Sequence, residues 1–567
     1  MHTRNQDATD GVSRAPAAPI WRLRVCRLVR RLPAPSAEGR ILLYVVLVLL
    51  LQMALYRVAV WYPDRDVSYD APYHIAMADL FGQMAWRKTF PAMYMSVWST
   101  HFADKEIGFH LLLCSLRRWA GLFGYRGDAP PFVLETACLL IGLIVSFVAA
   151  LKVLRVRQGY VLLPLLLFSC PLFTLRANLV RPHCVSIMAM VLTAAFLAER
   201  ISPRRQFWRL GILGLLLSYM HSNPHFILLP TACYALVTFA ERGWRALQPS
   251  LAALAGIVTG LTFHPQFPNT FLIWKIQCVD VVWHSIVRPA VGMNSPAELK
   301  PPGMVLVLDN LALPLLLALA LGTTLWRWRR GRAVPTDTRF LLLLALIAVP
   351  GFYLSRRVIE YALPFTLLAA AVVYRDTLGP RPLRVHLGCC AATLALGLAL
   401  TPMHMAYYRA AGAPIPRQFA AWARERLAPG SRIGNLCWDD FPHLFFAAPE
   451  YVYSYGLDPM FAYTANPGAY GRIGRILTGR EPMPMALDLM ETLQARLVFV
   501  GAPQAKAARA MMQSYYAVVY QGVDGWCFDL AAPPVDYGLP RPPLLSAPET
   551  PGAAANSPPP VPARPGS

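Results

Sequence analysis

Residues 41–74 of the chain read ILLYVVLVLLLQMALYRVAVWYPDRDVSYDAPYH. The part at 41–61 is almost wholly apolar, and an apolar stretch of about 20 residues is long enough to cross a bilayer as a helix. From Asp64 onwards the sequence turns polar, with aspartates at Asp64, Asp66 and Asp70. We therefore expect a first membrane span that leads directly into a polar loop.

The composition indicates that the apolar pattern is repeated along the chain. Of its 567 residues, 56% are hydrophobic and 15% are charged. A soluble protein carries about 25% charged residues, so much of this surface must face lipid. We predict an α-helical polytopic membrane protein with about 11 transmembrane helices. The predicted spans are 41–61, 132–151, 160–176, 182–198, 208–223, 225–240, 249–266, 304–326, 339–354, 358–374 and 385–403.

The positive charges are concentrated in alternate connections between these spans. The formal net charge is +22, which on a soluble chain would suggest nucleic acid. Here the cationic clusters mark cytoplasmic loops, with anionic membrane lipids as partners and no nucleic acid. The N-terminus is then cytoplasmic and the C-terminal part extracytoplasmic. The clusters are Lys152, Arg155 and Arg157; Arg200, Arg204 and Arg205; Arg242 and Arg245; Arg327, Arg329, Arg330 and Arg332; Arg375, Arg381 and Arg384.

The segment at 62–131 is the first extracytoplasmic loop in this topology. It contains an apolar piece at 107–123 that is too short to span and is interrupted by Arg117 and Arg118, so we predict a helix on the membrane surface. The alternative is a short span, which would invert every later orientation.

We predict four regions along the chain. Residues 1–40 form a basic cytoplasmic tail before a retained signal anchor, and 41–403 form the transmembrane domain. Residues 413–535 alternate helical pieces (418–427, 503–514) with strand-like pieces (432–437, 451–455, 496–500) and a hairpin at 517–530, as in a small α/β domain. Residues 536–567 are rich in proline, alanine and serine, which is typical of disorder. Cys437 and Cys527 would be able to pair if the α/β domain is extracytoplasmic.

Asp70 and His74 are the first candidate pair for chemistry. On a helix they share a face, and a carboxylate beside an imidazole suits acid/base catalysis. The structural alternative is an N-cap, because Asp70 precedes Pro72, which helices accept in their first turn.

A second candidate group is Asp104, Lys105 and Glu106, followed by His110. Its structural alternative is a capped and solvated helix start. Several histidines also lie at predicted outer turns, namely His221, His225 and His264. They lack the spacing of a known metal motif, so we predict no metal site from them.

Two arginine pairs lie at outer turns, where the charge rule does not require them. They are Arg176 with Arg181, and Arg356 with Arg357. The planar fork of arginine suits phosphate, so these pairs are candidates for holding a lipid-linked phosphate. The alternative is that they reach into the lipid headgroups.

These groups, in this order, resemble the bacterial members of the GT-C superfamily of polytopic glycosyltransferases. In that superfamily the first extracytoplasmic loop carries an essential acidic residue near its start, the place that Asp70 occupies in YDAPYH at 69–74. The stretch DKEIGFHLLL at 104–113 is similar to the later part of that loop. RPH at 181–183, RRVIEY at 356–361 and WDDFP at 438–442 also resemble segments of such proteins, and the resemblance covers residues 40–530.

The resemblance implies an inverting transfer from a polyprenyl-phosphate-linked sugar at the bacterial inner membrane. Asp70 would then be the base for the acceptor hydroxyl, with His74 tuning it or binding substrate, and Asp104 or Glu106 would be the second acidic residue that some members use. An arginine would stabilise the charge on the departing phosphate. No cofactor is required, and a divalent metal stays open. Oligosaccharyltransferase members carry a W-W-D-x-G signature that this chain lacks, which argues against N-glycan transfer.

Two other functions remain open at this point. A transporter or flippase for a lipid-linked or polar substrate would place ionisable residues at the bilayer midplane, often within repeats. A non-catalytic chain would use its membrane part as a scaffold for the C-terminal domain, where Asp439, Asp440, His443 and Asp458 would form a separate site. If Asp70 lies near Arg181 or Arg356, catalysis is favoured over a scaffold.

Overall fold

A computed structural model of the chain describes residues 46–47, 49–54, 65–66, 70–125, 132–156, 159–199, 201–284, 297–378 and 384–539. The predicted tail at 1–40, Asp64, most of the first predicted span and nearly all of the predicted disordered tail lie outside these residues. The chain divides into two compact units, Met1–Leu51 and Gln52–Ser567.

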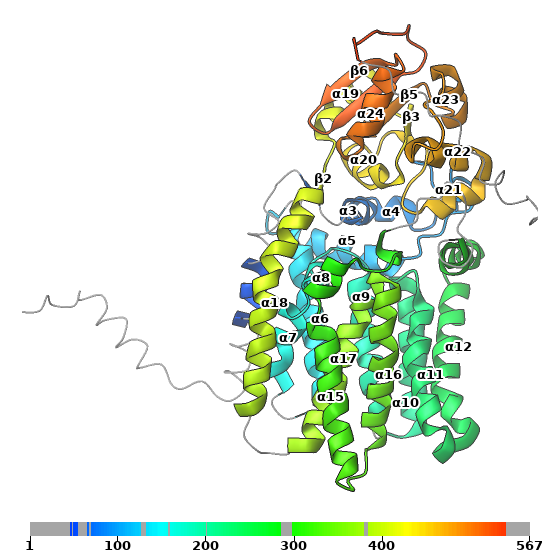
Figure 1. The fold of residues 1–567 in the computed structure, drawn as a ribbon. Helices are drawn as coiled ribbons and strands as arrows, with labels where there is room; N and C mark the ends of the chain where they lie inside the picture. The colour runs from blue at the N-terminus through cyan, green and yellow to red at the C-terminus, as the bar shows by residue number, and fades with distance from the viewer. Residues whose placement is uncertain are drawn as a thin grey trace, which may run out of the picture. The chain divides into compact units, whose positions relative to one another are not determined.

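Long helices run side by side in one region of the second unit (Figure 1). Three of them are long and apolar enough to cross a membrane, namely Val133–Val153, Thr336–Leu354 and Arg356–Thr377, and His183–Ala198 and Leu394–Ala406 are shorter apolar helices. The count of 11 spans therefore stays a prediction. The helices are α6 (Val133–Val153), α7 (Leu163–Phe168), α8 (Pro171–Ala177), α9 (His183–Ala198), α10 (Pro203–Met220), α11 (Leu228–Arg242), α12 (Gln248–Thr262), α13 (Asn269–Lys275), α14 (Met304–Asp309), α15 (Ala312–Arg329), α16 (Thr336–Leu354), α17 (Ile359–Leu378) and α18 (Arg384–Ala411).

Two predicted spans are interrupted, so the prediction of continuous helices there was wrong. The span at 160–176 is divided into α7 and α8, where Pro171 begins α8 because proline has no N–H to continue the preceding helix. The span at 304–326 is divided into α14 and α15 at Asn310. The Asn310 side chain accepts a hydrogen bond from the Leu172 N–H at 3.3 Å and donates to the Leu306 carbonyl at 2.8 Å, so it joins the two breaks.

Helices α10 and α12 pack against each other through glycines. A Cβ atom at Gly256 of α12 would lie 2.0 Å from the carbonyl oxygen of Gly211, and one at Gly214 would lie 2.4 Å from that of Ala253. Gly256 and Gly260 have the small-xxx-small spacing that lets membrane helices approach closely. This contact fixes the distance between the adjoining ends of the two helices.

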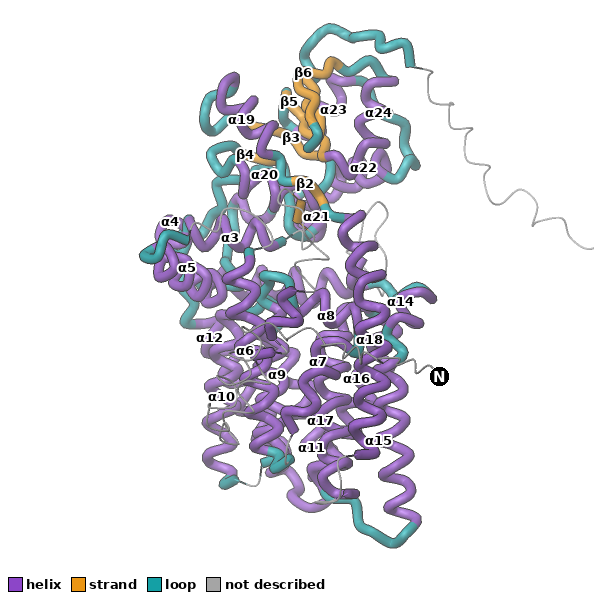
Figure 2. The backbone as a smooth tube through the Cα atoms, turned by 90° about the vertical axis from the view of Figure 1, so that its left-hand side faces the viewer, coloured by secondary structure: helices purple, strands orange, loops and turns teal. Residues whose placement is uncertain are grey.

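The C-terminal part contains a five-stranded sheet of order β4-β3-β5-β7-β6. Its strands are drawn in orange in Figure 2. Strands β3, β4 and β5 are parallel, whereas β7 pairs antiparallel with β5 and β6. The predicted helix at 418–427, the three strands and the hairpin are confirmed; the predicted helix at 503–514 begins later, at Ala505. The elements are β2 (Ala413–Pro414), α19 (Arg417–Arg426), β3 (Arg432–Asn435), α20 (Phe441–Ala447), β4 (Val452–Tyr453), α21 (Pro459–Ala465), α22 (Pro467–Leu477), α23 (Ala486–Leu493), β5 (Leu497–Gly501), α24 (Ala505–Gln513), β6 (Ala517–Gly522) and β7 (Gly525–Asp529).

Cys437 and Cys527 are free, so the suggested pairing is not formed. Cys437 follows β3 and Cys527 lies on β7, and β5 separates these strands. Neighbouring strands lie about 4.8 Å apart, so two strands with a third between them are too far apart for the Cα distance of a disulfide.

The loop after the first predicted span packs against this C-terminal sheet. Its elements are β1 (Arg65–Asp66), α3 (Ala71–Asp79), α4 (Phe81–Met84) and α5 (Ile107–Gly121). Trp98 and Phe461 have ring centroids 5.0 Å apart within one buried cluster that holds residues of the loop and of the sheet. The Tyr453 N–H donates to the Ala92 carbonyl at 2.9 Å, and the Met95 N–H donates to the Ser454 carbonyl at 2.8 Å. Loop and sheet therefore share one core, and the proposed domain limits stay a prediction.

Candidate functional site

Asp70 stands at the N-cap position of α3, with Pro72 in the first turn. The predicted capping hydrogen bond is absent from this described helix, because the carboxylate instead forms an ion pair with the Arg181 guanidinium before α9. Burial raises the pKa of Asp70 above its usual value, and Arg181 opposes this effect. The sequence alone left Asp70 as either a catalytic carboxylate or a helix cap. In the structure its carboxylate pairs with Arg181.

Arg181 belongs to a group of ionic side chains that we call the arginine cluster. It consists of Arg176, Arg181 and Arg357 around Glu298, together with Asp70 and Glu360. Glu298 Oε2 lies 3.1 Å from Arg176 Nη1 and 3.5 Å from Arg181 Nη1, and Glu298 Oε1 lies 3.1 Å from Arg357 Nη1. Burial alone would raise the pKa of Glu298, but the three guanidinium groups hold it well below its usual value.

The cluster is balanced in charge, with three guanidinium groups and three carboxylates. Its innermost pair joins Arg176 Nε to Glu360 Oε1 at 2.5 Å, and the Glu360 side chain is fully buried. Arg356, which the sequence places in the same phosphate-binding group, lies apart and donates from Nε to the Pro301 carbonyl at 3.2 Å. The structure therefore brings together three of the four predicted arginines.

Replacing Arg176 by methionine should destabilise the protein by about 3–5 kcal/mol, because it leaves the buried Glu360 carboxylate without its partner. Adding Glu360→Gln should recover much of this loss, since no uncompensated charge then remains. Arg209→Met, which breaks the more exposed pair with Glu199, is the control and should cost about 1 kcal/mol or less. Unfolding titrations in mixed micelles measure the three differences. Equal losses in the single and the double variant would contradict the prediction.

A chain of buried side chains lies beside the cluster. His74 Nδ1 is 2.9 Å from His110 Nε2, and His110 Nδ1 is 2.8 Å from Asp104 Oδ2. Glu106 donates its backbone N–H to Asp104 Oδ1, and all four residues are buried. The predicted solvated helix start is therefore wrong for Asp104 and Glu106.

The hydrogen bonds define how His74 and His110 are protonated when neutral. The Asp104 carboxylate only accepts, so His110 carries its proton on Nδ1 and accepts on Nε2 from the His74 Nδ1–H. His74 Nε2 then keeps a lone pair. Burial, His110 and Arg181 lower the pKa of His74 well below its usual value, which favours this neutral form.

One group in the described part of the chain has side chains arranged as metal ligands. His74, Glu106 and His110 each offer one ligand atom, and these atoms lie within 4.8 Å of one another. It differs from the histidines at the predicted outer turns, since His264 Nε2 contacts the Asp104 carbonyl and His221 lies beside Arg357. Binding of a divalent metal therefore stays a possibility. The candidate ligands are His74, Glu106 and His110, and not the histidines of the predicted outer turns.

Asp439, between β3 and α20, lies near enough to Asp70 for the two charges to interact. Burial, and then the charge of Asp70, raise the pKa of Asp439 to about 7, while His443 and Arg181 oppose the shift. Its neighbour Asp440 accepts a hydrogen bond from the Gly501 N–H at 3.4 Å. From the sequence, these aspartates were expected in a separate site, whereas in the structure the charge of Asp70 acts on Asp439.

Asp439→Asn should stabilise the protein at pH 8 by on the order of 1–2 kcal/mol and change it little at pH 4.5. The folded chain holds the Asp439 proton more tightly than the unfolded chain, so the stability from this group is present below about pH 4 and is lost as the pH rises through 7. Melting temperatures at pH 4.5, 6 and 8 measure this effect. The control is Asp488→Asn, a half-exposed carboxylate, which should show no such trend. A pH-independent effect of Asp439→Asn would contradict the prediction.

Glu298, the centre of the cluster, was not among the residues predicted from the sequence. It lies in the turn η7 (Ala297–Leu299) within a predicted outer loop, where any charge is informative under the rule that singled out the arginines. If every charge in a predicted outer loop had been taken as a candidate, Glu298 would have been among them. No sequence signal connects Asp439 to Asp70.

No protein-family model and no curated protein sequence matches the chain. Solved structures do match it. The oligosaccharyltransferase of Archaeoglobus fulgidus in the apo form has a TM-score of 0.54 at 11% identity, over 87% of this chain and 75% of that one. ArnT from Cupriavidus metallidurans bound to undecaprenyl phosphate has a TM-score of 0.52 at 15% identity, over 88% and 99%. The A. fulgidus protein in complex with zinc and sulfate has a TM-score of 0.52 at 12% identity, over 85% and 73%. These matches show that the chain shares the fold of the oligosaccharyltransferase and of ArnT, as the resemblance implies.

Proposed function

We propose that this chain, whose fold is that of the GT-C superfamily, is a membrane glycosyltransferase that moves a sugar from a polyprenyl-phosphate-linked donor to an extracytoplasmic acceptor. The acceptor class comprises an envelope glycan, lipid or protein. The observation that carries the proposal is the ion pair of Asp70 with Arg181 within the arginine cluster. It joins a carboxylate suited to a base with guanidinium groups suited to phosphate.

In the proposed reaction, Asp70 takes the proton of the acceptor hydroxyl while that oxygen attacks the anomeric carbon. The bond between this carbon and the phosphate oxygen breaks on the opposite face, and its electron pair leaves with the lipid phosphate, so the configuration inverts. Asp70 loses its negative charge in the step in which the phosphate gains one. Arg181 can then change its partner from Asp70 to the phosphate without a net change in its ion pairing.

The buried histidine chain would act on this step through its position. His74 lies one helical turn after Asp70 on α3 and is oriented by His110 and Asp104. Its Nε2 lone pair would bind a substrate hydroxyl. A divalent metal on His74, Glu106 and His110 would need His110 Nε2, so it would replace the hydrogen bond between the two imidazoles. We therefore assign His74 and Glu106 to substrate or metal binding and Asp104 to positioning.

The proposed topology places this site outside the cytoplasm of the bacterial inner membrane. It keeps the 11 predicted spans, the cytoplasmic N-terminus and the anionic lipids at the basic loops. Solvent-exposed apolar residues on α6 support lipid contact, with Ile141 45% and Val145 59% exposed. The contact of Asp70 with Arg181 supports catalysis over the scaffold alternative, in which these residues would lie apart.

Mass spectrometry of envelope glycans and polyprenyl-linked sugars tests this function in cells with and without the protein. Without it, one polyprenyl-phosphate-linked sugar should accumulate and one glycosylated envelope product should disappear, and re-expression should reverse both. Identical profiles would contradict the proposal. Accumulation of the donor on the cytoplasmic side alone, with no transferase activity in the purified protein, would favour a flippase.

A further inference from the structure

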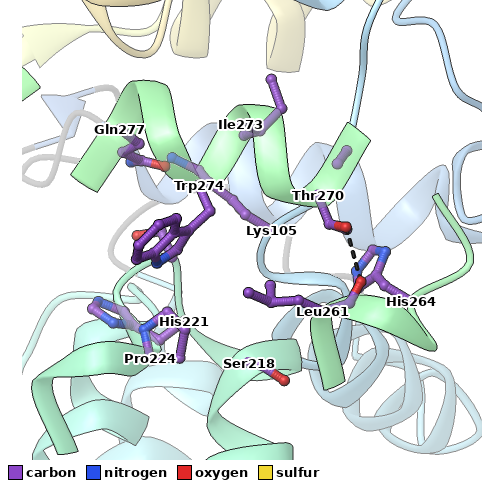
Figure 3. Close-up of a pocket in the computed structure, with 12 residues that line it drawn as sticks. Lys105, Ser218, His221, Pro224, Leu261, His264, Thr270, Ile273, Trp274 and Gln277 are labelled. Carbon is purple, nitrogen blue, oxygen red and sulfur yellow. Dashed lines mark hydrogen bonds between the residues drawn. The ribbon is translucent and has the colours of Figure 1, made fainter. Parts of the chain in front are cut away.

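The groups around a buried histidine show how many protons its ring carries. His264, which lines the small pocket in Figure 3, is satisfied as a neutral ring. Its Nδ1 accepts from the Gln266 N–H at 3.2 Å, and its Nε2 donates to the Asp104 carbonyl at 3.2 Å. One ring proton is enough here, because one partner donates and the other accepts.

His443 on α20 has acceptors at both ring nitrogens. Its Nδ1 lies 3.3 Å from the Asp439 carbonyl, and its Nε2 lies 3.5 Å from Asp66 Oδ2. A carbonyl only accepts, so Nδ1 carries a proton. A second proton must then lie between Nε2 and the carboxylate, because otherwise two lone pairs would face each other. The ring and Asp66 therefore form an imidazolium–carboxylate pair.

This pair is withdrawn from water, with 4% of the His443 side chain and 6% of the Asp66 side chain exposed. Burial lowers the pKa of His443. The Asp66 carboxylate, the Asp439 carbonyl and the charge of Asp440 outweigh burial and leave this pKa above its usual value. The surroundings thus favour the charged ring that the two acceptors require.

Other charged and titratable groups belong to elements that pack against α20. After burial, Asp66 has the largest effect on the pKa of His443, so the pair with β1 dominates. The other groups are Asp439 and Asp440 in the turn before α20; Asp70, His74 and Asp79 from the start to the end of α3; and Arg424 on α19, which donates to the Ala447 carbonyl at the far end of α20.

The pair connects the chain before Asp70 to the C-terminal part. Asp66 lies on β1, four residues before Asp70, whereas His443 lies on α20. Helix α20 packs against α3, the helix that Asp70 begins (Figure 1). The Tyr73 and Phe445 ring centroids are 6.1 Å apart in this contact. One imidazolium therefore ties the segment that precedes Asp70 to the helix that packs beside it.

We propose that His443, as an imidazolium paired with Asp66, is a positioning residue that holds the start of α3, and with it Asp70, against the C-terminal part. The role in catalysis rests on the proposed function, whereas the hold of His443 on Asp66 does not. Loss of the second proton would leave the buried carboxylate without a donor at Nε2. The hold is therefore present below about pH 6.5 and is lost as the pH rises through the higher pKa of the folded chain.

Hydrogen exchange measured by mass spectrometry on the full chain in micelles tests the hold without any substrate. In wild type, protection of the peptide that contains β1, corrected for intrinsic exchange, should fall about tenfold or more from pH 6 to pH 8.5, since a hydrogen bond to a charged group is lost. His443→Gln should give the low protection at both pH values. His101→Gln is the control, because His101 is an exposed histidine of the same loop, and it should behave as wild type.

Asp66→Asn is the second variant, and it carries the test if His443→Gln does not fold. An amide N–H can donate to Nε2 of a neutral ring, so the contact survives without the second proton. Protection of β1 in Asp66→Asn should therefore be the same at pH 6 and pH 8.5. A fall as large as in wild type would overturn the proposal, as would equal protection in wild type and His443→Gln.

The rate of transfer tests the positioning role. At pH 6, His443→Gln should lower kcat by about 10- to 100-fold and leave KM within about twofold, because a small displacement of Asp70 affects the reaction more than binding. An unchanged kcat beside the expected loss of protection would overturn the positioning role and keep the hold. A wild-type chain with no transferase activity would refute the proposed function and this role together, while hydrogen exchange would still decide the hold.

Discussion

Replacing Asp70 by asparagine should lower the rate of sugar transfer by about 100- to 10,000-fold, the usual contribution of a general base. Asparagine keeps the shape of the side chain but cannot take the acceptor proton. It also leaves Arg181 paired only with Glu298, so the coupling between proton uptake and phosphate release is lost. The rate is measured with purified protein, on the donor and product that the envelope comparison identifies.

The control for this variant is Asp79→Asn on the same helix. Asp79 also pairs with an arginine, at 3.0 Å from Arg117 Nε, but its side chain is 52% exposed. Its replacement should leave the rate within about twofold of wild type, since exposed pairs contribute little. A folded Asp70→Asn variant with wild-type rates would exclude Asp70 as the base.

Arg357→Gln should lower the rate by about 100- to 1,000-fold, as the loss of one preorganised charge donor does elsewhere. The adjacent Arg356→Gln should leave the rate close to wild type. The reason is geometric: Arg357 contacts Glu298 within the cluster, whereas Arg356 donates to the Pro301 carbonyl. Arg357→Lys should lie between the two, because lysine keeps the charge but not the planar fork.

Equal losses at the two positions would mean that charge near the membrane matters and its exact place does not. That outcome would support headgroup contact by both arginines. The comparison is sharp because the residues are neighbours of the same type, so membrane insertion and net charge change alike.

The three long apolar helices could be predicted from apolar runs because such runs reflect the solvent directly, whereas the count of 11 spans and their orientation stay predictions. The breaks within the spans at 160–176 and 304–326 were harder to predict. Pro171 carries a local signal that its segment begins a new helix, but the break at Asn310 depends on its bond to Leu172, a contact that no periodicity reveals. Membrane spans with such breaks read as continuous runs in the sequence.

The residues of the candidate site could also be predicted only in part. Asp70, Arg181 and Arg357 could be found because each is a charge at a predicted outer turn. The side chains with which they pair could not be found from the sequence. Arg356 and Arg357 are adjacent, and only their directions in the folded turn decide that Arg357 contacts Glu298 while Arg356 does not. Asp439 was assigned to another site because its approach to Asp70 joins segments far apart in sequence.

The core that the loop shares with the C-terminal sheet sets an order of events during biosynthesis. Trp98 is made early, but its partner Phe461 follows more than 300 residues later. At about 5–20 residues per second, the loop waits roughly 20 to 70 s for the surface that completes its core. Under the proposed topology, this interval is spent outside the cytoplasm with aromatic side chains uncovered. A chain that ends before Phe461 therefore lacks the surface that completes this core.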